Sequence, residues 1–151
     1  MIILLYGQPT SGKTTLAMAL QKKLNNHKNV IFHLDGDFWR KINQNTGYDK
    51  SARLKNLHSA FNLALTLNEQ GIDVIMSFVC PYREIIKEFS KLTDIFIEIY
   101  LHSNIDRGRT AYYVNDFEPP ERESKCLKID TGNESIEESL KKCFKYIIDK
   151  M

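Results

Sequence analysis

A glycine-rich stretch near the N-terminus has the residue types and the spacing that bind nucleotide phosphates. Residues 7–14 read Gly-Gln-Pro-Thr-Ser-Gly-Lys-Thr, which fits the pattern G-x-x-x-x-G-K-[ST] between an apolar run and a helical stripe. The glycines let backbone N–H groups converge on a phosphate, and the next helix adds its positive end. Lys13 reaches phosphate oxygens in such a loop, and the Thr14 hydroxyl ligates Mg²⁺. The predicted ATP-binding residues here are Gly7, Thr10, Ser11, Gly12, Lys13, Thr14 and Thr15.

Two acids separated by a glycine, Asp35 and Asp37, follow the apolar run 30–34. Ligands of open α/β sheets bind at the carboxyl ends of the strands, where these acids are expected. One carboxylate there can face Mg²⁺ and an incoming hydroxyl while the other orients a neighbour. The alternative is an acidic turn or a helix cap, which a phosphate loop close by makes less favoured.

The elements that must position these residues alternate between strand and helix. Apolar runs predict strands at 2–6, 30–34, 72–78, 95–101 and 126–130, and a polar turn at 25–29. Helical stripes predict helices from the loop to about 25, at 38–42, 51–70 and 82–92, and one at the C-terminal end. Residues 131–134 carry a capping-box signal for that last helix, whose expected buried face is Ile136, Leu140, Cys143, Phe144 and Ile147. The expected fold is a three-layer α/β/α P-loop kinase fold with a five-stranded parallel sheet.

Length and composition are those of one globular domain spanning 1–151. The chain is 42% hydrophobic and 26% charged, with a net charge of +2 and no basic block, so we expect no nucleic-acid partner. The N-terminal apolar run is too short for a signal peptide or a membrane span, which predicts a cytoplasmic protein without a membrane partner. Three cysteines without metal-ligand spacing are expected to be free thiols. The sequence leaves a homodimer open.

Residues 102–123 have no clean period, and we interpret them as a lid. Arginine and aromatic side chains occur together there, which suits anionic, ring-bearing ligands. A loop of this length in a compact domain is usually functional or disordered. A mobile surface loop is the alternative.

Five motifs together resemble the adenylylsulfate kinase family of P-loop kinases over roughly the first 100 residues. They are the phosphate loop 7–14, Asp35-Gly36-Asp37 with Arg40, the pair Gly47-Tyr48, the Arg-x-x-Asn of Arg53 and Asn56, and Ser77-Phe78-Val79-Cys80-Pro81-Tyr82-Arg83. The resemblance implies a kinase that moves the γ-phosphate of ATP to the 3′-hydroxyl of adenylyl sulfate, as in sulfate assimilation, with Mg²⁺ as cofactor.

The resemblance also implies the role of each matching residue. Lys13 and Asp35 would be catalytic, with Thr14 and Asp35 at the metal. An acceptor site would comprise Asp37, Arg40, Tyr48, Arg53, Asn56, Ser77, Phe78, Val79, Pro81 and Phe117. Of these, Arg40, Arg53 and Asn56 would hold the acceptor's anionic group and Tyr48 would stack on its base. Arg107 and Arg109 would touch the ATP phosphates.

The chain departs from the family in the lid, which is shorter and altered, and in Leu57-His58 after the Arg-x-x-Asn motif. Because the lid faces the acceptor, an alternative keeps the chemistry on another activated nucleotide, such as a cytidine-diphosphate adduct (a phosphoramidate, for example) used in surface-polysaccharide decoration. An alternative of another class is an ATP-binding regulatory module.

Overall fold

The computed structural model describes residues 1–26 and 30–151, and the sheet it contains has the predicted strands. These are β1 (Ile2–Tyr6), β2 (Ile31–Asp35), β3 (Asp73–Phe78), β4 (Phe96–His102) and β5 (Leu127–Asp130). All pairs are parallel, in the order β2-β3-β1-β4-β5. Of the turn expected at 25–29, residues 27–29 lie outside the described part.

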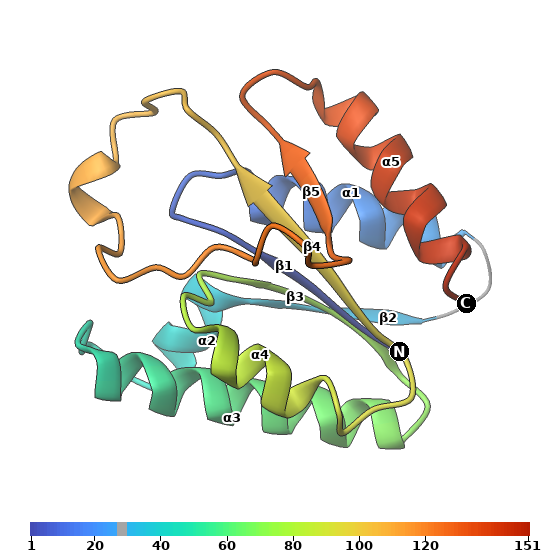
Figure 1. Cartoon of the computed structure of the whole chain (residues 1–151). Helices are drawn as coiled ribbons and strands as arrows, with labels where there is room; N and C mark the ends of the chain where they lie inside the picture. The colour runs from blue at the N-terminus through green and yellow to red at the C-terminus, as the bar shows by residue number, and fades with distance from the viewer. Residues whose placement is uncertain (27–29) are drawn as a thin grey trace.

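Helices cover both faces of the sheet, as Figure 1 shows. α1 (Lys13–Asn25) and α5 (Ile136–Ile148) lie on one face, and α2 (Gly36–Ile42), α3 (Lys50–Glu69) and α4 (Arg83–Phe89) lie on the other. Each face of the sheet carries a hydrophobic core, and successive residues of β1 alternate between the two. Ile3 and Leu5 pack with α1 and α5, whereas Ile2, Leu4 and Tyr6 pack towards α3 and α4. A strand buried on both faces explains the unbroken apolar run at 2–6. The predicted three-layer fold is confirmed.

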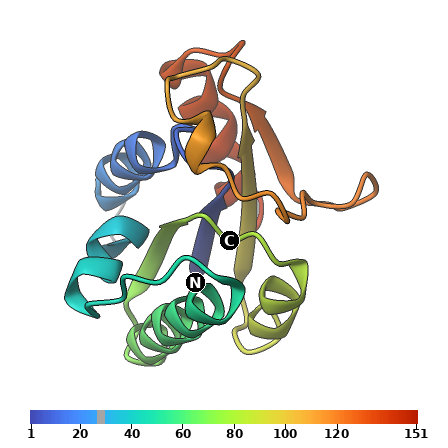
Figure 2. The ribbon, with the colours of Figure 1, turned by 90° about the vertical axis from the view of Figure 1, so that its left-hand side faces the viewer.

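The segment between β4 and β5 extends beyond the carboxyl ends of the strands (Figures 1 and 2). It contains one 3₁₀ turn, Thr110–Tyr112, and otherwise irregular backbone. The phosphate loop and the α2–α3 connection lie at the same end of the sheet. Both predicted binding regions therefore meet beside the predicted lid.

The start of α5 corrects a prediction. Its capping box is formed by Ser135 and Glu138, not by residues 131–134. Both stretches fit the same pattern, but the Thr131 hydroxyl is already engaged, since it donates to the carbonyls of Ser11 (2.8 Å) and His102 (3.2 Å). Ile136 was expected in the buried face of the helix, but it is the first residue of α5 and is 58% exposed.

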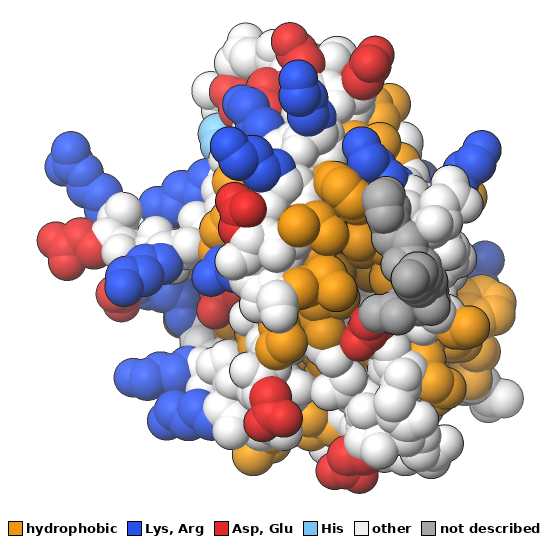
Figure 3. Space-filling model, turned by 90° about the vertical axis from the view of Figure 1, so that its right-hand side faces the viewer, with side chains coloured by type: hydrophobic (Ala, Val, Ile, Leu, Met, Phe, Trp, Pro, Cys, Tyr) orange, Lys and Arg blue, Asp and Glu red, His pale blue; other side chains and the backbone are white. Residues whose placement is uncertain are grey.

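The far end of the molecule, at the amino ends of the strands, shows hydrophobic side chains among interspersed charges of both signs (Figure 3). Val30 and Phe32 of the edge-strand region are among the exposed apolar residues. The edge of β2 is partly blocked by α1, because Gln21 donates to the carbonyl of Ile31 (2.8 Å) and Asn25 accepts from its N–H (3.1 Å). Satisfying edge groups in this way discourages strand pairing with another chain. Within the described residues, no helix is long and apolar enough to cross a bilayer.

The cysteines behave as predicted. Cys80 and Cys143 are buried, Cys126 is half-buried, and all three are free. Burial raises the pKa of the Cys143 thiol to about 12, so this thiol stays protonated at neutral pH.

Candidate active site

The phosphate loop joins β1 to α1 and requires glycine at two positions for different reasons. A Cβ on Gly7 would lie 2.2 Å from the carbonyl oxygen of Leu101, so the close approach of β4 excludes a side chain. Gly12 has φ of 89° in the left-handed region and precedes the first residue of α1. The loop therefore curls tightly onto the helix N-terminus, the geometry that presents backbone N–H groups to an anion.

Lys13 is held inside this loop. Its ammonium donates to the carbonyl of Gln8 (2.8 Å) and lies 3.4 Å from the hydroxyl oxygen of Ser11. Burial lowers the pKa of Lys13 to about 8, an effect that the carboxylates of Asp37 and Asp35 oppose. A desolvated ammonium whose nearest partner is neutral would gain strongly from a phosphate placed beside it.

Asp35 is the centre of the polar network at the ends of β2 and β3. The parallel register places Asp35 beside Ser77. One carboxylate oxygen, Oδ2, accepts from the hydroxyls of Thr14 (2.7 Å) and Ser77 (2.9 Å). The other, Oδ1, accepts from the N–H groups of Asp37 and Phe38, which makes Asp35 the N-cap of α2. The helix-cap alternative and the active-site prediction are thus compatible.

Hydrogen bonding keeps Asp35 ionised. Burial alone would raise its pKa, but the bonds from Thr14, Ser77 and the Phe38 amide outweigh that effect, and the pKa lies below its usual value. Such a carboxylate is a weak base and a good partner for a cation. Within the described residues, no three acidic, histidine or cysteine side chains come together as a metal site.

The oxygen donors of Thr14 and Asp35 suit Mg²⁺ chemically. Both are hard oxygen ligands, and Mg²⁺ in kinases is typically held by one or two protein oxygens, phosphates and water. The Thr14 hydroxyl can bind a cation through a lone pair while its proton still points at Asp35, the contact that the structure already shows. The residues present therefore fit the ion.

A second cluster gathers three predicted acceptor residues. The guanidinium of Arg40 lies 4.5 Å from the ring centroid of Tyr48, and that of Arg53 lies 5.6 Å from it. Arg40 also donates to the carbonyl of Gly47 (2.5 Å) and Arg53 to the carbonyl of Tyr48 (2.7 Å). Burial lowers the pKa of Arg40, with a contribution from the charge of Arg53, but arginine stays protonated. Two fixed cations beside an exposed aromatic ring can bind a compact anion carrying a base.

The other predicted acceptor residues differ in exposure. Asn56 is 5% exposed, and its Oδ1 atom has no hydrogen-bond partner among the described residues. Phe78 and Pro81 are buried, with Phe78 part of the core under α3 and α4, and Val79 is half-buried. Asp37 is exposed, two residues after Asp35. Phe117 packs against the same core, 6.1 Å between ring centroids from Tyr100. Contact of Val79, Phe78, Pro81 and Phe117 with an acceptor stays a prediction.

The lid is tied to the rest of the site at three places. Arg107 and Arg109 are both exposed, and Arg107 donates to the carbonyls of Thr10 (2.5 Å) and Thr131 (2.9 Å). Gln8 forms two hydrogen bonds with the backbone of Val114. Further along, Glu118 accepts from the N–H of Arg83 (2.9 Å), and its own N–H donates to the carbonyl of Pro81 (2.8 Å). The lid thus spans from the phosphate loop to the N-terminus of α4.

Sequence reasoning missed three residues that shape this site. Thr131 holds the carbonyl of Ser11 from the end of β5, Gln8 holds the lid, and His33 contacts Ser77. Thr131 lies directly after a predicted strand, which is the one signal that would have found it. Gln8 occupies a position of the motif that admits any residue, and His33 lies inside a strand, so neither position carries a signal in the sequence that marks it as part of the site.

Comparison with known proteins places these observations in a family. The model of the adenylylsulphate kinase family matches residues 1–111. An adenylyl-sulfate kinase of Oceanobacillus iheyensis is 32% identical over 167 residues, covering 95% of this chain and 82% of that protein. A cytidine diphosphoramidate kinase of Campylobacter jejuni is 36% identical over 117 residues, covering 74% of this chain and 68% of that protein.

The fold agrees with these sequence relationships. The structure of the Mycobacterium tuberculosis APS kinase in complex with AMPPNP and APS superposes with a TM-score of 0.82 at 21% identity, covering 97% of this chain and 96% of that one. The superposition covers nearly the whole chain and so includes residues beyond those that the family model matches.

Proposed function

This chain belongs to the adenylylsulphate kinase family, and on that premise we propose that it transfers the γ-phosphate of ATP to the 3′-hydroxyl of adenylyl sulfate. That the chain is an ATP-dependent kinase follows from the family. The acceptor and the residue roles are the proposal. The observation that carries the proposal is that two sites lie at the carboxyl end of the sheet. One is the phosphate loop with Asp35, and the other is the cluster of Arg40, Tyr48 and Arg53.

In this proposal the phosphate loop binds ATP and Lys13 moves from the Gln8 carbonyl to phosphate oxygens. Thr14 and Asp35 would hold Mg²⁺, which when bound would neutralise charge on the phosphates. Asp35 stays ionised and orients the acceptor hydroxyl, and Arg107 adds positive charge from the lid side. Phosphoryl transfer depends mainly on positioning and charge stabilisation, so a carboxylate of low pKa is adequate for this role.

The acceptor's anionic group would bind between Arg40 and Arg53, with its base against Tyr48. Fork-shaped guanidinium groups suit sulfate and phosphate oxygens. The unpaired Oδ1 of Asn56 supplies an acceptor for a hydroxyl or amine of the same ligand.

A second acceptor is favoured by one specific observation, the 36% identity with the cytidine diphosphoramidate kinase. The chemistry and the phosphate-loop roles would be the same, and a cytidine-diphosphate adduct would replace adenylyl sulfate.

An ADP-release assay with an acceptor panel tests the proposal. The panel holds adenylyl sulfate, a cytidine-diphosphate adduct, a plain nucleoside and no acceptor, each with Mg-ATP. Turnover with adenylyl sulfate well above the acceptor-free rate supports the first assignment. Turnover with the cytidine adduct alone supports the second. Equal slow hydrolysis in every arm would contradict both and favour the regulatory module.

A further inference from the structure

A chain of three side chains runs from the surface to the proposed metal site. His33 of β2 lies with Nε2 at 2.8 Å from the hydroxyl oxygen of Ser77, and Ser77 donates to Oδ2 of Asp35 at 2.9 Å. The same Oδ2 accepts from Thr14. Asp35 and Ser77 lie at the carboxyl ends of β2 and β3, Thr14 lies in the first turn of α1, and His33 lies inside β2, two residues before Asp35 and on the same face of the strand.

The direction of each hydrogen bond follows from counting protons. The Ser77 hydroxyl has one proton, which it gives to Asp35. Its bond to His33 must therefore use a lone pair of the serine oxygen, and His33 Nε2 must carry the proton.

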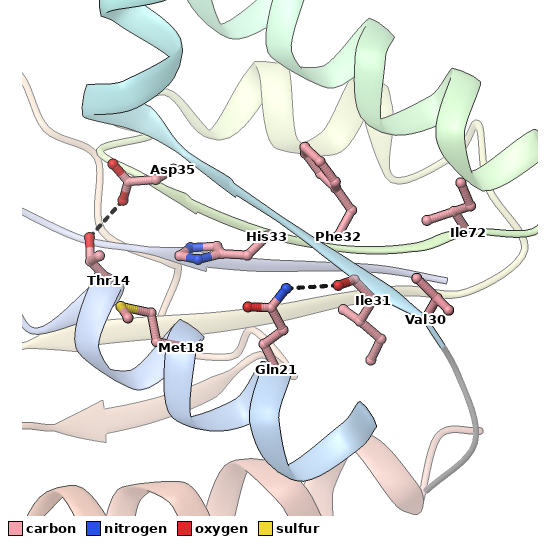
Figure 4. A pocket seen from close by; sticks show the side chains of 9 residues that line it. All are labelled: Thr14, Met18, Gln21, Val30, Ile31, Phe32, His33, Asp35 and Ile72. Carbon is pink, nitrogen blue, oxygen red and sulfur yellow. Dashed lines mark hydrogen bonds between the residues drawn. The ribbon is translucent and has the colours of Figure 1, made fainter. Parts of the chain in front are cut away.

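His33 lines a pocket of about 540 Å³ on the outer side of β2. Figure 4 shows its ring beside Thr14 and Asp35 at one end of this pocket, with Val30 and Ile72 at the other. Two side chains of α1 also line the pocket beside the ring, the apolar Met18 and the uncharged amide of Gln21. Among the described residues, the hydrogen bond of Nε2 is the one with Ser77.

We propose that His33 is a positioning residue that acts through Ser77 on Asp35. As an Nε2 donor it prevents the serine hydroxyl from turning away, so that Ser77 keeps its proton on Oδ2. Asp35 is then held in the orientation that suits the cation shared with Thr14. This inference rests on the proposed metal role of Asp35 and assigns a function to a residue that lies outside the family motifs quoted above.

Calorimetric titration with ADP, in the presence and in the absence of Mg²⁺, tests the proposal without any acceptor. The quantity is the ratio of the two affinities, which measures the gain due to the metal. His33→Leu should lower this ratio about fivefold, because a loss of that size corresponds to the net contribution of one hydrogen bond. The affinity for ADP without Mg²⁺ should be unchanged. His33→Gln should keep the ratio within about twofold of the wild type, because its side-chain amide can place a donor near the position of Nε2.

The pairing with Ser77 is tested by a double-mutant cycle. In the Ser77→Ala background, His33→Leu should cause no further loss, since the residue through which it acts is gone. A purely structural role would instead give additive losses and a similar fall in ADP affinity with and without Mg²⁺. Either result, or a His33→Gln variant as impaired as His33→Leu, would overturn the proposal.

Asp35→Asn serves as the reference. If it removes the Mg²⁺ gain while His33→Leu does not, the role of His33 alone is wrong and the proposed metal site stands. If both leave the gain intact, the metal role of Asp35 is wrong and the inference falls with it. Failure of the acceptor panel leaves these titrations unaffected.

Discussion

The side-chain amide of Gln8 is paired with the backbone of Val114, 106 residues further along the chain. Its Nε2 donates to the Val114 carbonyl and its Oε1 accepts from the Val114 N–H, both at 2.9 Å. Gln8 also offers its own carbonyl to Lys13. One residue of the phosphate loop thus contacts both the lid and the lysine expected to bind ATP, which gives the ATP site a direct mechanical link to the lid.

We expect Gln8→Leu to loosen the lid. Losing a two-point contact worth about 1–2 kcal/mol should raise the KM for the acceptor several-fold and the KM for ATP less, because the backbone of the loop is unchanged. Hydrogen exchange at the Val114 amide should accelerate in the same variant. Gln21→Leu is the matched control, since it removes one side-chain bond to the Ile31 backbone at the far edge of the sheet. Unchanged exchange at Val114 would show that the pairing is not what holds the lid.

Asp35→Asn should lower kcat by about 100-fold or more, because the variant loses the charge that orients metal and hydroxyl. Asparagine is an equally good N-cap, so α2 should be retained, whereas the hydrogen bonds from Thr14 and Ser77 lose their charged acceptor and the melting temperature should fall modestly. Asp37→Asn, two residues away and exposed, is the comparison and should lose far less activity. Steady-state kinetics with saturating ATP check this, and a kcat for Asp35→Asn within a few-fold of the wild type would remove Asp35 from the chemistry.

Lys13→Met should abolish turnover and stabilise the ligand-free protein at neutral pH. The pKa of Lys13 is about 8 in the folded protein and has its usual value of 10.5 in the unfolded chain. Between these two pH values the unfolded state therefore binds more protons than the folded state. The cost of burying the charge is full below pH 8 and disappears as the pH rises towards 10.5.

The stability advantage of Lys13→Met over the wild type should therefore shrink between pH 7 and pH 10. Urea unfolding at the two pH values measures it, and other titrating groups cancel because both proteins share them. An advantage that is constant or grows with pH would mean that the ammonium is not desolvated in the empty loop.

Arg53→Ala should raise the KM for the acceptor about tenfold to 100-fold and leave the KM for ATP unchanged, because one of two cations at the proposed anion site is lost. Lys41→Ala on α2 removes an exposed charge from the same region and is the control. If the two variants behave alike, long-range charge and not a specific contact determines acceptor binding.

Most of the fold and the ATP side of the site could be predicted because their signals are local. The apolar run 2–6, the helical stripes and the phosphate loop each occupy consecutive residues. The position of Asp35 beside the phosphate loop was predictable for the same reason, since it directly follows a strand, whereas its chemical role stays a prediction.

The contacts that were missed depend on which strands become neighbours. His33 meets Ser77 because β2 lies beside β3, and Thr131 reaches Ser11 because β5 ends near the phosphate loop. The capping box was predicted at the wrong residues for a similar reason. Two adjacent stretches satisfy one local pattern, and a contact 120 residues away in sequence decides between them. The lid pairing of Gln8 likewise leaves no trace in the sequence around either partner.

Product identification by two-dimensional ¹H–³¹P NMR tests the central claim most directly. The protein is incubated with Mg-ATP and the acceptor that is active in the panel, and Lys13→Ala serves as the inactive control. The account predicts a new phosphomonoester whose phosphorus correlates with the ribose H3′ of the acceptor, formed in step with ADP and absent with the variant. ADP that accumulates only with inorganic phosphate, or a phosphoester on another hydroxyl, would contradict it.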